Sequence, residues 1–257
     1  MKKQKSKISC IGIIPARFDS QRLPGKPLVS IAGKPMIEQV YRRAKKAKNL
    51  DEVIVATDDK RIFKTVKDFG GKVFLTPKNL KSGSDRVAFV AKKLNCDIVV
   101  NIQGDEPTIK PEMIDQLVES LKKEPTVPMA TLVRKIENKE NLGNPNLVKV
   151  VKTKDNLALY FSRYCIPYFR SENGQRRFDK SKLKNYFEHI GIYAYRKNFL
   201  LKFTQMPPSP LEMAEKLEQL RVLENGYKIK LVETKFKTHP VDTKADIKIV
   251  EKILRNE

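Results

Sequence analysis

The chain has 257 residues, of which 40% are hydrophobic and 32% are charged, and this is the composition of a globular protein with a substantial core. It excludes a disordered chain, a collagen and a disulfide scaffold. No apolar run reaches the roughly 20 residues of a membrane span, and residues 1–9 lack the apolar segment of a secretion signal. We therefore expect a soluble cytoplasmic protein with no membrane partner.

The net charge is high, because 52 Lys and Arg residues face 30 Asp and Glu residues, which gives +22. Such an excess can mark a nucleic-acid-binding protein. The basic residues are spread along the whole chain, however, without a long basic block after residue 7 and without an RNA-binding aromatic signature. We interpret the charge as a lysine-rich solvated surface and expect no nucleic-acid partner. Cys10, Cys96 and Cys165 lack metal-ligand spacing and are interpreted as buried residues in a reducing compartment.

The first half of the chain alternates apolar strands with amphipathic helices. The predicted strands cover residues 8–14, 52–57, 73–75 and 97–102, and the predicted helices cover 36–48, 60–69, 84–94 and 111–122. Apolar strands separated by helices of this length predict a mostly parallel sheet with helices on both faces.

The pattern loosens after about residue 125. We expect strands at 129–133, 148–152, 158–161, 189–195 and 229–233, helices at 210–224 and 244–254, and an exposed charged loop at 171–184. One α/β domain with a smaller inserted lobe fits this pattern better than two independent domains. We predict a core of about residues 8–125 plus 228–257 and a lobe of about 126–227.

A loop rich in proline and basic residues follows the first strand. It contains Arg17, Arg22 and Lys26 together with Gly25. Ligands of an open parallel sheet bind beyond the carboxyl ends of its strands, and arginine and lysine side chains there suit a polyphosphate. The spacing is not that of a Walker loop. The alternative interpretation is a charged surface loop without a ligand.

Two acidic motifs also follow or precede regular elements. Asp105 lies in the sequence QGDEP after the strand at 97–102, and Asp242 lies in HPVDT before the last helix. Mg²⁺ is typically held by one or two carboxylates plus substrate phosphates, so converging aspartates would make a metal site. Each residue also has a purely structural interpretation, Asp105 as a turn residue and Asp242 as a helix cap.

At these motifs the chain resembles the 3-deoxy-manno-octulosonate cytidylyltransferases, which join CMP to the eight-carbon sugar acid Kdo. The sequences LYFSR, HIGIYAYR and LEQLR, in this order, are the most specific part of the resemblance. The matching segments run nearly from end to end: 13–28, 33–37, 55–59, 82–86, 101–107, 144–151, 159–163, 166–168, 189–196, 217–226 and 241–243.

The resemblance implies a Rossmann-like core of the nucleotide-diphospho-sugar transferase type, a dimerising lobe, Mg²⁺ as cofactor, and a homodimer. The implied substrates are CTP and Kdo, the implied product is CMP-Kdo for lipopolysaccharide biosynthesis, and pyrophosphate is released. The implied catalytic residues are Arg17, Lys26, Asp105 and Asp242, the last two as metal ligands. The implied nucleotide contacts are Ala16, Arg17, Arg22, Lys26, Ser82, Gly83, Arg86 and Gln103. The implied sugar contacts are Gln103, Arg163, His189, Tyr193 and Glu218.

Each of the less specific site residues has an alternative interpretation. Arg163 could pair with a nearby acid, His189 and Tyr193 could be core residues, and Glu218 and Arg86 could lie on solvated helix surfaces. The chain also departs from the family pattern, because Met213 and Ala214 stand where we expect a histidine and a larger aliphatic residue. The alternative substrate is therefore another acidic sugar, such as an 8-amino analogue of Kdo or a nonulosonic acid.

Overall fold

The computed structural model describes residues 8–19, 23–170, 183 and 185–256. Arg22 and almost all of the expected loop at 171–184 lie outside the described residues.

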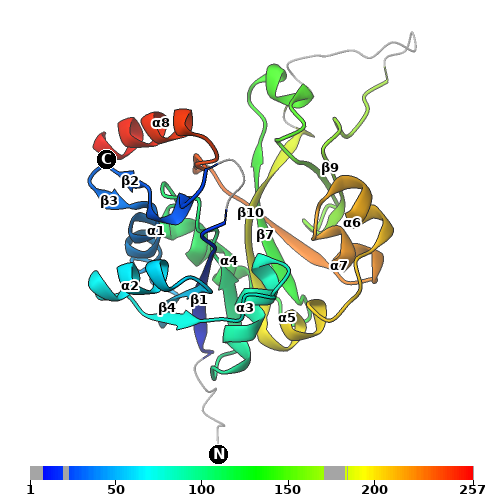
Figure 1. Cartoon of the computed structure of the whole chain (residues 1–257). Helices are drawn as coiled ribbons and strands as arrows, with labels where there is room; N and C mark the ends of the chain where they lie inside the picture. Colours follow the sequence, from blue (N-terminus) through cyan, green and yellow to red (C-terminus); the bar gives the residue numbers. More distant parts are fainter. Residues whose placement is uncertain (1–7, 20–22, 171–182, 184, 257) are drawn as a thin grey trace, which may run out of the picture.

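A nine-stranded sheet forms the centre of the protein (Figure 1). Seven strands follow the order β11-β7-β10-β6-β1-β4-β5, and β8 and β9 extend the sheet from β10. Along the seven-strand path, β10 runs antiparallel to both neighbours and every other pair is parallel. The strands are β1 Cys10–Ala16, β4 Glu52–Thr57, β5 Val73–Leu75, β6 Ile98–Asn101, β7 Met129–Lys135, β8 Lys149–Lys152, β9 Ala158–Ser162, β10 Phe187–Arg196 and β11 Ile229–Glu233, with a separate pair β2 Ser30–Ile31 and β3 Lys34–Pro35.

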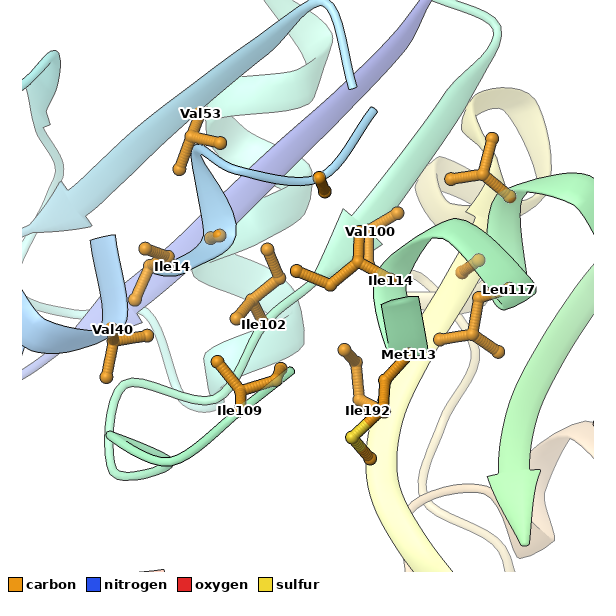
Figure 2. Packing of buried hydrophobic residues seen from close by; sticks show 14 of the residues in the cluster. Ile14, Val40, Val53, Val100, Ile102, Ile109, Met113, Ile114, Leu117 and Ile192 are labelled. Atoms are coloured by element: carbon orange, nitrogen blue, oxygen red, sulfur yellow. The ribbon is translucent and has the colours of Figure 1, made fainter. Parts of the chain in front are cut away.

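Helices cover both faces of this sheet, which confirms the predicted fold class. The apolar cluster on one face contains side chains of α1, α2 and α4, and Figure 2 shows Val40 of α1 and Leu117 of α4 among its members. The cluster on the other face contains side chains of α3, α5 and α7. The helices are α1 Met36–Ala44, α2 Lys60–Asp68, α3 Gly83–Lys92, α4 Pro111–Lys123, α5 Lys197–Phe203, α6 Pro210–Glu215, α7 Leu220–Glu224 and α8 Lys244–Arg255, with 3-10 turns η1 Lys26–Leu28 and η2 Lys139–Gly143.

The apolar sequence of β1 follows from its place at the centre of the sheet. Ile14 packs in the cluster on one face, whereas Ile11 and Ile13 pack in the cluster on the other. Successive side chains of a strand point to opposite faces, so a strand covered on both sides needs apolar residues at consecutive positions. None of the described helices is long and apolar enough to cross a membrane.

One expectation about the second half needs correction. The helix predicted at 210–224 is two short helices, because Lys216 adopts a left-handed conformation with φ of 55° and ends α6. The strands β7 and β10 belong to the predicted lobe in sequence, yet they lie in the central sheet, with β10 beside β6 and β7 between β10 and β11. The predicted boundary therefore divides one continuous sheet, and the division into core and lobe stays a prediction.

Candidate active site

The site is built where β1 and β6 end side by side. The two strands are parallel neighbours, so the loop after Ala16 and the turn after Asn101 leave the sheet at the same edge. Gly104 lets them approach closely, because a Cβ atom at this position would lie 2.8 Å from the backbone oxygen of Pro15. A side chain at position 104 would force the turn away from β1.

Lys26, Asp105 and Asp242 come together at this edge from three distant parts of the chain. The Lys26 Nζ atom lies 2.8 Å from Asp105 Oδ2 and 3.0 Å from Asp242 Oδ1. The two acidic loops are also joined through their backbones, since the Val241 N–H donates to the Asp105 carbonyl at 2.9 Å. Burial lowers the pKa of Lys26, but attraction to Asp105 and then Asp242 outweighs burial, so the pKa is raised and the ammonium stays charged.

The two carboxylates suit a divalent cation that a bound phosphate completes. Asp105 and Asp242 keep 36% and 39% of their side-chain surface exposed, and both direct an oxygen at the same cationic atom. Across the described part of the chain, no group of three or more His, Cys, Asp and Glu side chains is placed to hold a metal by protein ligands alone. Mg²⁺ commonly uses one or two carboxylates and takes its other oxygen ligands from substrate and water, and these residues fit that pattern.

Arg17 and the start of α3 form a second group beside the end of β1. The Arg17 Nη2 atom donates to the carbonyls of Leu80 and of Ser82, the latter at 3.2 Å. Ser82 is the N-cap of α3, where its hydroxyl accepts from the Asp85 N–H while the Asp85 carboxylate accepts from the Ser82 N–H. Gly83 begins the helix. The guanidinium of Arg17 therefore lies next to the N-terminus of α3, and this combination suits a bound phosphate. Ala16 is 3% exposed, and contact between Ala16 and a nucleotide stays a prediction.

Arg86 does not lie on a helix surface, so the alternative interpretation of this residue is wrong. Its side chain is fully buried, with Nη2 donating to Asp58 Oδ2 at 2.7 Å and Nη1 donating to the Thr76 hydroxyl. Burial lowers the pKa of Arg86, and the ion pair with Asp58 opposes that effect. The guanidinium therefore joins α3 to the loops that follow β4 and β5. Contact between Arg86 and a nucleotide stays a prediction.

A cleft of about 650 Å³ opens beside β10 and contains two of the residues expected to contact sugar, His189 and Tyr193. The His189 Nε2 atom lies 2.9 Å from the Thr131 hydroxyl, and its ring packs at 75° against the ring of Phe161. The Tyr193 hydroxyl donates to Gln219 Oε1 at 3.2 Å. The lining also includes Glu106, Arg134, Asn144, Asn146, Leu147, Glu188 and His239.

The environment of His189 predicts a pH-dependent stability. Burial lowers the pKa of His189 from 6.5 to about 3, so the folded protein keeps a neutral imidazole where the unfolded chain binds a proton. Because the unfolded state then holds more protons, the free energy of unfolding falls as pH drops below about 6.5, by up to about 1.4 kcal/mol per pH unit. Urea unfolding of the wild type and of His189→Gln between pH 7.5 and 5 should show the steeper loss in the wild type. Equal slopes would show that His189 titrates normally in the folded state.

The other expected sugar contacts lie outside this cleft or at its border. Arg163 lines a neighbouring cavity of about 840 Å³, and its guanidinium donates to the carbonyls of Glu215 at 2.7 Å and Pro145 at 3.0 Å. Glu218 accepts from the Ser84 hydroxyl of α3 at 2.6 Å, and burial raises its pKa, so it is not a freely solvated acid. Gln103 lies in the turn after β6, where its carbonyl accepts from the Glu106 N–H.

Two residues of the cleft, Glu106 and Gln219, could not be selected from the sequence. Burial, reinforced by Asp105, raises the pKa of Glu106 to about 8, so its carboxyl holds a proton at neutral pH. Gln219 is 3% exposed, and its Nε2 atom has no partner among the described residues. Both residues adjoin ones that we selected, Asp105 and Glu218, but neighbouring polar residues differ in burial, and only the three-dimensional structure separates them.

Basic residues and a carboxylate pair at the carboxyl edge of a mostly parallel sheet define a nucleotidyltransferase of the nucleotide-diphospho-sugar transferase fold. A family model described as "Cytidylyltransferase" matches residues 11–230. The chain belongs to the family of the 3-deoxy-manno-octulosonate cytidylyltransferases, as the following relatives show.

The relatives match the chain over nearly its whole length. A 3-deoxy-manno-octulosonate cytidylyltransferase of Geobacter metallireducens is 49% identical over 95% of this chain and 97% of its own. The enzyme of the same description from Fusobacterium nucleatum is 51% identical over 93% of this chain and 94% of its own. The solved structure of a CMP:2-keto-3-deoxy-manno-octonic acid synthetase complexed with CTP superposes with a TM-score of 0.88 at 42% identity, covering 96% of this chain and 99% of that one.

Proposed function

We propose that the protein transfers CMP from CTP to the 2-hydroxyl of Kdo and releases pyrophosphate, which activates Kdo for lipopolysaccharide biosynthesis. The observation that carries this proposal is the convergence of Lys26, Asp105 and Asp242 at the edge of the sheet, in a chain with cytidylyltransferase relatives along its whole length. Glu106, the residue after Asp105, lines the cleft that contains His189 and Tyr193. This cleft offers the space for a sugar acid.

The reaction requires positioning and charge neutralisation more than covalent catalysis. The sugar hydroxyl attacks the α-phosphorus in line, the new O–P bond forms, and the bond to the oxygen bridging the α- and β-phosphorus breaks as pyrophosphate leaves. The proton of the hydroxyl passes by way of water to the pyrophosphate. In this proposal Lys26 and Arg17 bind the triphosphate oxygens, and the N-terminus of α3 at Ser82 and Gly83 holds the nucleotide. The neutral imidazole of His189 and the hydroxyl of Tyr193 orient the sugar acid by hydrogen bonds.

We infer that Asp105 and Asp242 hold Mg²⁺ when CTP is bound. Such an ion neutralises phosphate charge and lowers the pKa of a coordinated hydroxyl. The two carboxylates leave room for phosphate oxygens because each is more than a third exposed. Lys26, between them, donates to both carboxylates and so directs them at one point.

We further propose a cytoplasmic homodimer without nucleic-acid or membrane partners. Three free cysteines, all buried, are typical of a reducing compartment. Leu159, Tyr164 and Tyr168 are 58% or more exposed near β9, and large exposed apolar residues of this kind favour a subunit contact.

The proposed nucleotide-binding core supplies Arg17, Lys26 and Asp105 to the site. The proposed lobe at 126–227 supplies His189, Tyr193 and Gln219.

Pyrophosphate release is the direct test of this function. Release should require CTP, Kdo and Mg²⁺ together, and excess EDTA should abolish it because it removes the cation that would neutralise the phosphate charge beside the two carboxylates. Added Mg²⁺ should restore the rate. Release with an 8-amino analogue or a nonulosonic acid but not with Kdo would move the assignment to the alternative substrate. Undiminished release in EDTA would reject the metal site.

A further inference from the structure

The charged residue Lys149 of β8 is completely buried, although no part of the reaction described above uses it. Its side chain has 0% exposure, and burial lowers the pKa of Lys149. Removing an ammonium from water is costly unless its hydrogens find partners, whereas a methionine would fill the same space without that cost. Packing alone therefore does not explain a lysine at this position.

The ammonium uses its three hydrogens on three backbone carbonyls rather than on a carboxylate. The Nζ atom donates to Asn144 at 2.9 Å, to Leu147 at 2.6 Å and to Arg163 at 2.6 Å. The first two carbonyls belong to one turn, and the third follows β9. The ammonium of Lys149 thus connects the turn with the segment that contains Arg163 through charge-assisted hydrogen bonds.

This turn forms the wall between the two cavities of the sugar-acid side. Asn144, Asn146 and Leu147 line the cleft of about 650 Å³, whereas Pro145 lines the cavity of about 840 Å³. The Pro145 carbonyl also accepts from Arg163 Nη1 at 3.0 Å, which is a second link between the turn and this arginine.

The turn is also connected to the floor of the cleft. The His189 N–H donates to the carbonyl of Val148, the residue between the turn and Lys149, at 2.8 Å. Lys149 itself lies opposite Glu188 in the pairing of β8 with β10. The residues that surround the ammonium therefore belong to the sugar-acid side, and the hydrogen bonds of Lys149 include none to Arg17, Lys26 or Ser82.

We infer that Lys149 is a positioning residue that fixes the turn at 144–147 and the Arg163 segment, and thereby shapes the binding site for the sugar acid. The inference rests on the proposed function, because it assigns the cleft to Kdo. Lys149 does not touch the substrate. It acts through the wall of the cleft, so its removal should weaken use of the sugar acid and spare the binding of CTP.

The test compares Lys149→Met with Lys152→Met, a control on the same strand whose ammonium contacts Asn156 Oδ1 instead of the turn. For Lys149→Met, the KM for Kdo should rise about tenfold or more while the Kd for CTP stays within about twofold. The reason is that a displaced turn at 144–147 changes only the site for the sugar acid. Lys152→Met should change neither constant. If Lys149→Met yields too little folded protein, Lys149→Gln keeps two donors and should show the same split with a smaller rise.

A double-mutant cycle with Arg163→Ala separates positioning from general loss of stability. Lys149→Met should raise the KM for Kdo much less in the Arg163→Ala background than alone, because both changes loosen the same wall. An unchanged KM, an equal weakening of CTP binding, or fully additive effects would each overturn the inference. The wild type is assayed in parallel: no turnover of Kdo by the wild type rejects the proposed function, whereas normal wild-type turnover with an unchanged KM in the variant rejects the role of Lys149 alone.

Discussion

Replacing Asp105 with asparagine should lower kcat by at least about 100-fold, because an amide cannot supply the negative charge that holds a divalent cation against the triphosphate. The substitution keeps the shape of the side chain. It also removes one of the two carboxylates that Lys26 contacts, at 2.8 Å, while Asp242 stays 3.0 Å from the ammonium. Since Asp105 is 36% exposed, its loss should have little effect on folding. Turnover at saturating CTP and Kdo, together with the melting temperature, checks both statements.

The matched control for this variant is Asp68→Asn. Asp68 also forms an ion pair with a lysine, Lys64, at 2.8 Å, but the pair is exposed on α2 and away from the sheet edge. Its loss should leave kcat unchanged. Turnover of Asp105→Asn within about threefold of the wild type would reject Asp105 as a metal ligand, and an equal fall in both variants would indicate a general effect of lost charge.

The first half of the fold could be predicted from the sequence because each element carries a local signal. Glu52–Thr57 and Val73–Leu75 have the predicted bounds, since both are short apolar runs that end at turn residues. The place of β10 could not be predicted in this way. It lies antiparallel between β6 and β7, and that arrangement depends on pairing between distant segments rather than on the periodicity of any one of them.

The site shows the same division between local and tertiary information. The sheet rule put the loop of Lys26 and the turn of Asp105 at carboxyl ends of strands, and the structure brings them together because β1 and β6 are parallel neighbours. The break at Lys216 could not be predicted, because the region around α6 is held by tertiary contacts, including the one from Arg163 to the Glu215 carbonyl. Arg163 lines one cavity and His189 lines the other, and these two cavities likewise form only when the turn at 144–147 is in place between them.

Arg86 provides the prediction with the largest expected effect on stability. Arg86→Met should lower the free energy of unfolding by about 3 kcal/mol, because it leaves the Asp58 carboxylate and the Thr76 hydroxyl without the guanidinium that now joins them. Asp58 is 16% exposed, so little water can replace the lost partner. Urea unfolding measures the change, and the exposed Lys64→Met should cost less than about 1 kcal/mol in the same assay.

The same measurement decides whether Arg86 acts on the nucleotide or only on the fold. If its guanidinium acts only by joining Asp58 and Thr76 to α3, the stabilisation that saturating CTP gives to the folded protein should be the same in Arg86→Met and in the wild type. A cycle with Asp58→Asn should then show a coupling of about 2 kcal/mol, since either change alone breaks the pair. Loss of the CTP-dependent stabilisation with no change in the free energy of unfolding would instead make Arg86 a nucleotide contact. Because the Arg86 side chain is fully buried between α3 and the loops after β4 and β5, we expect the first result.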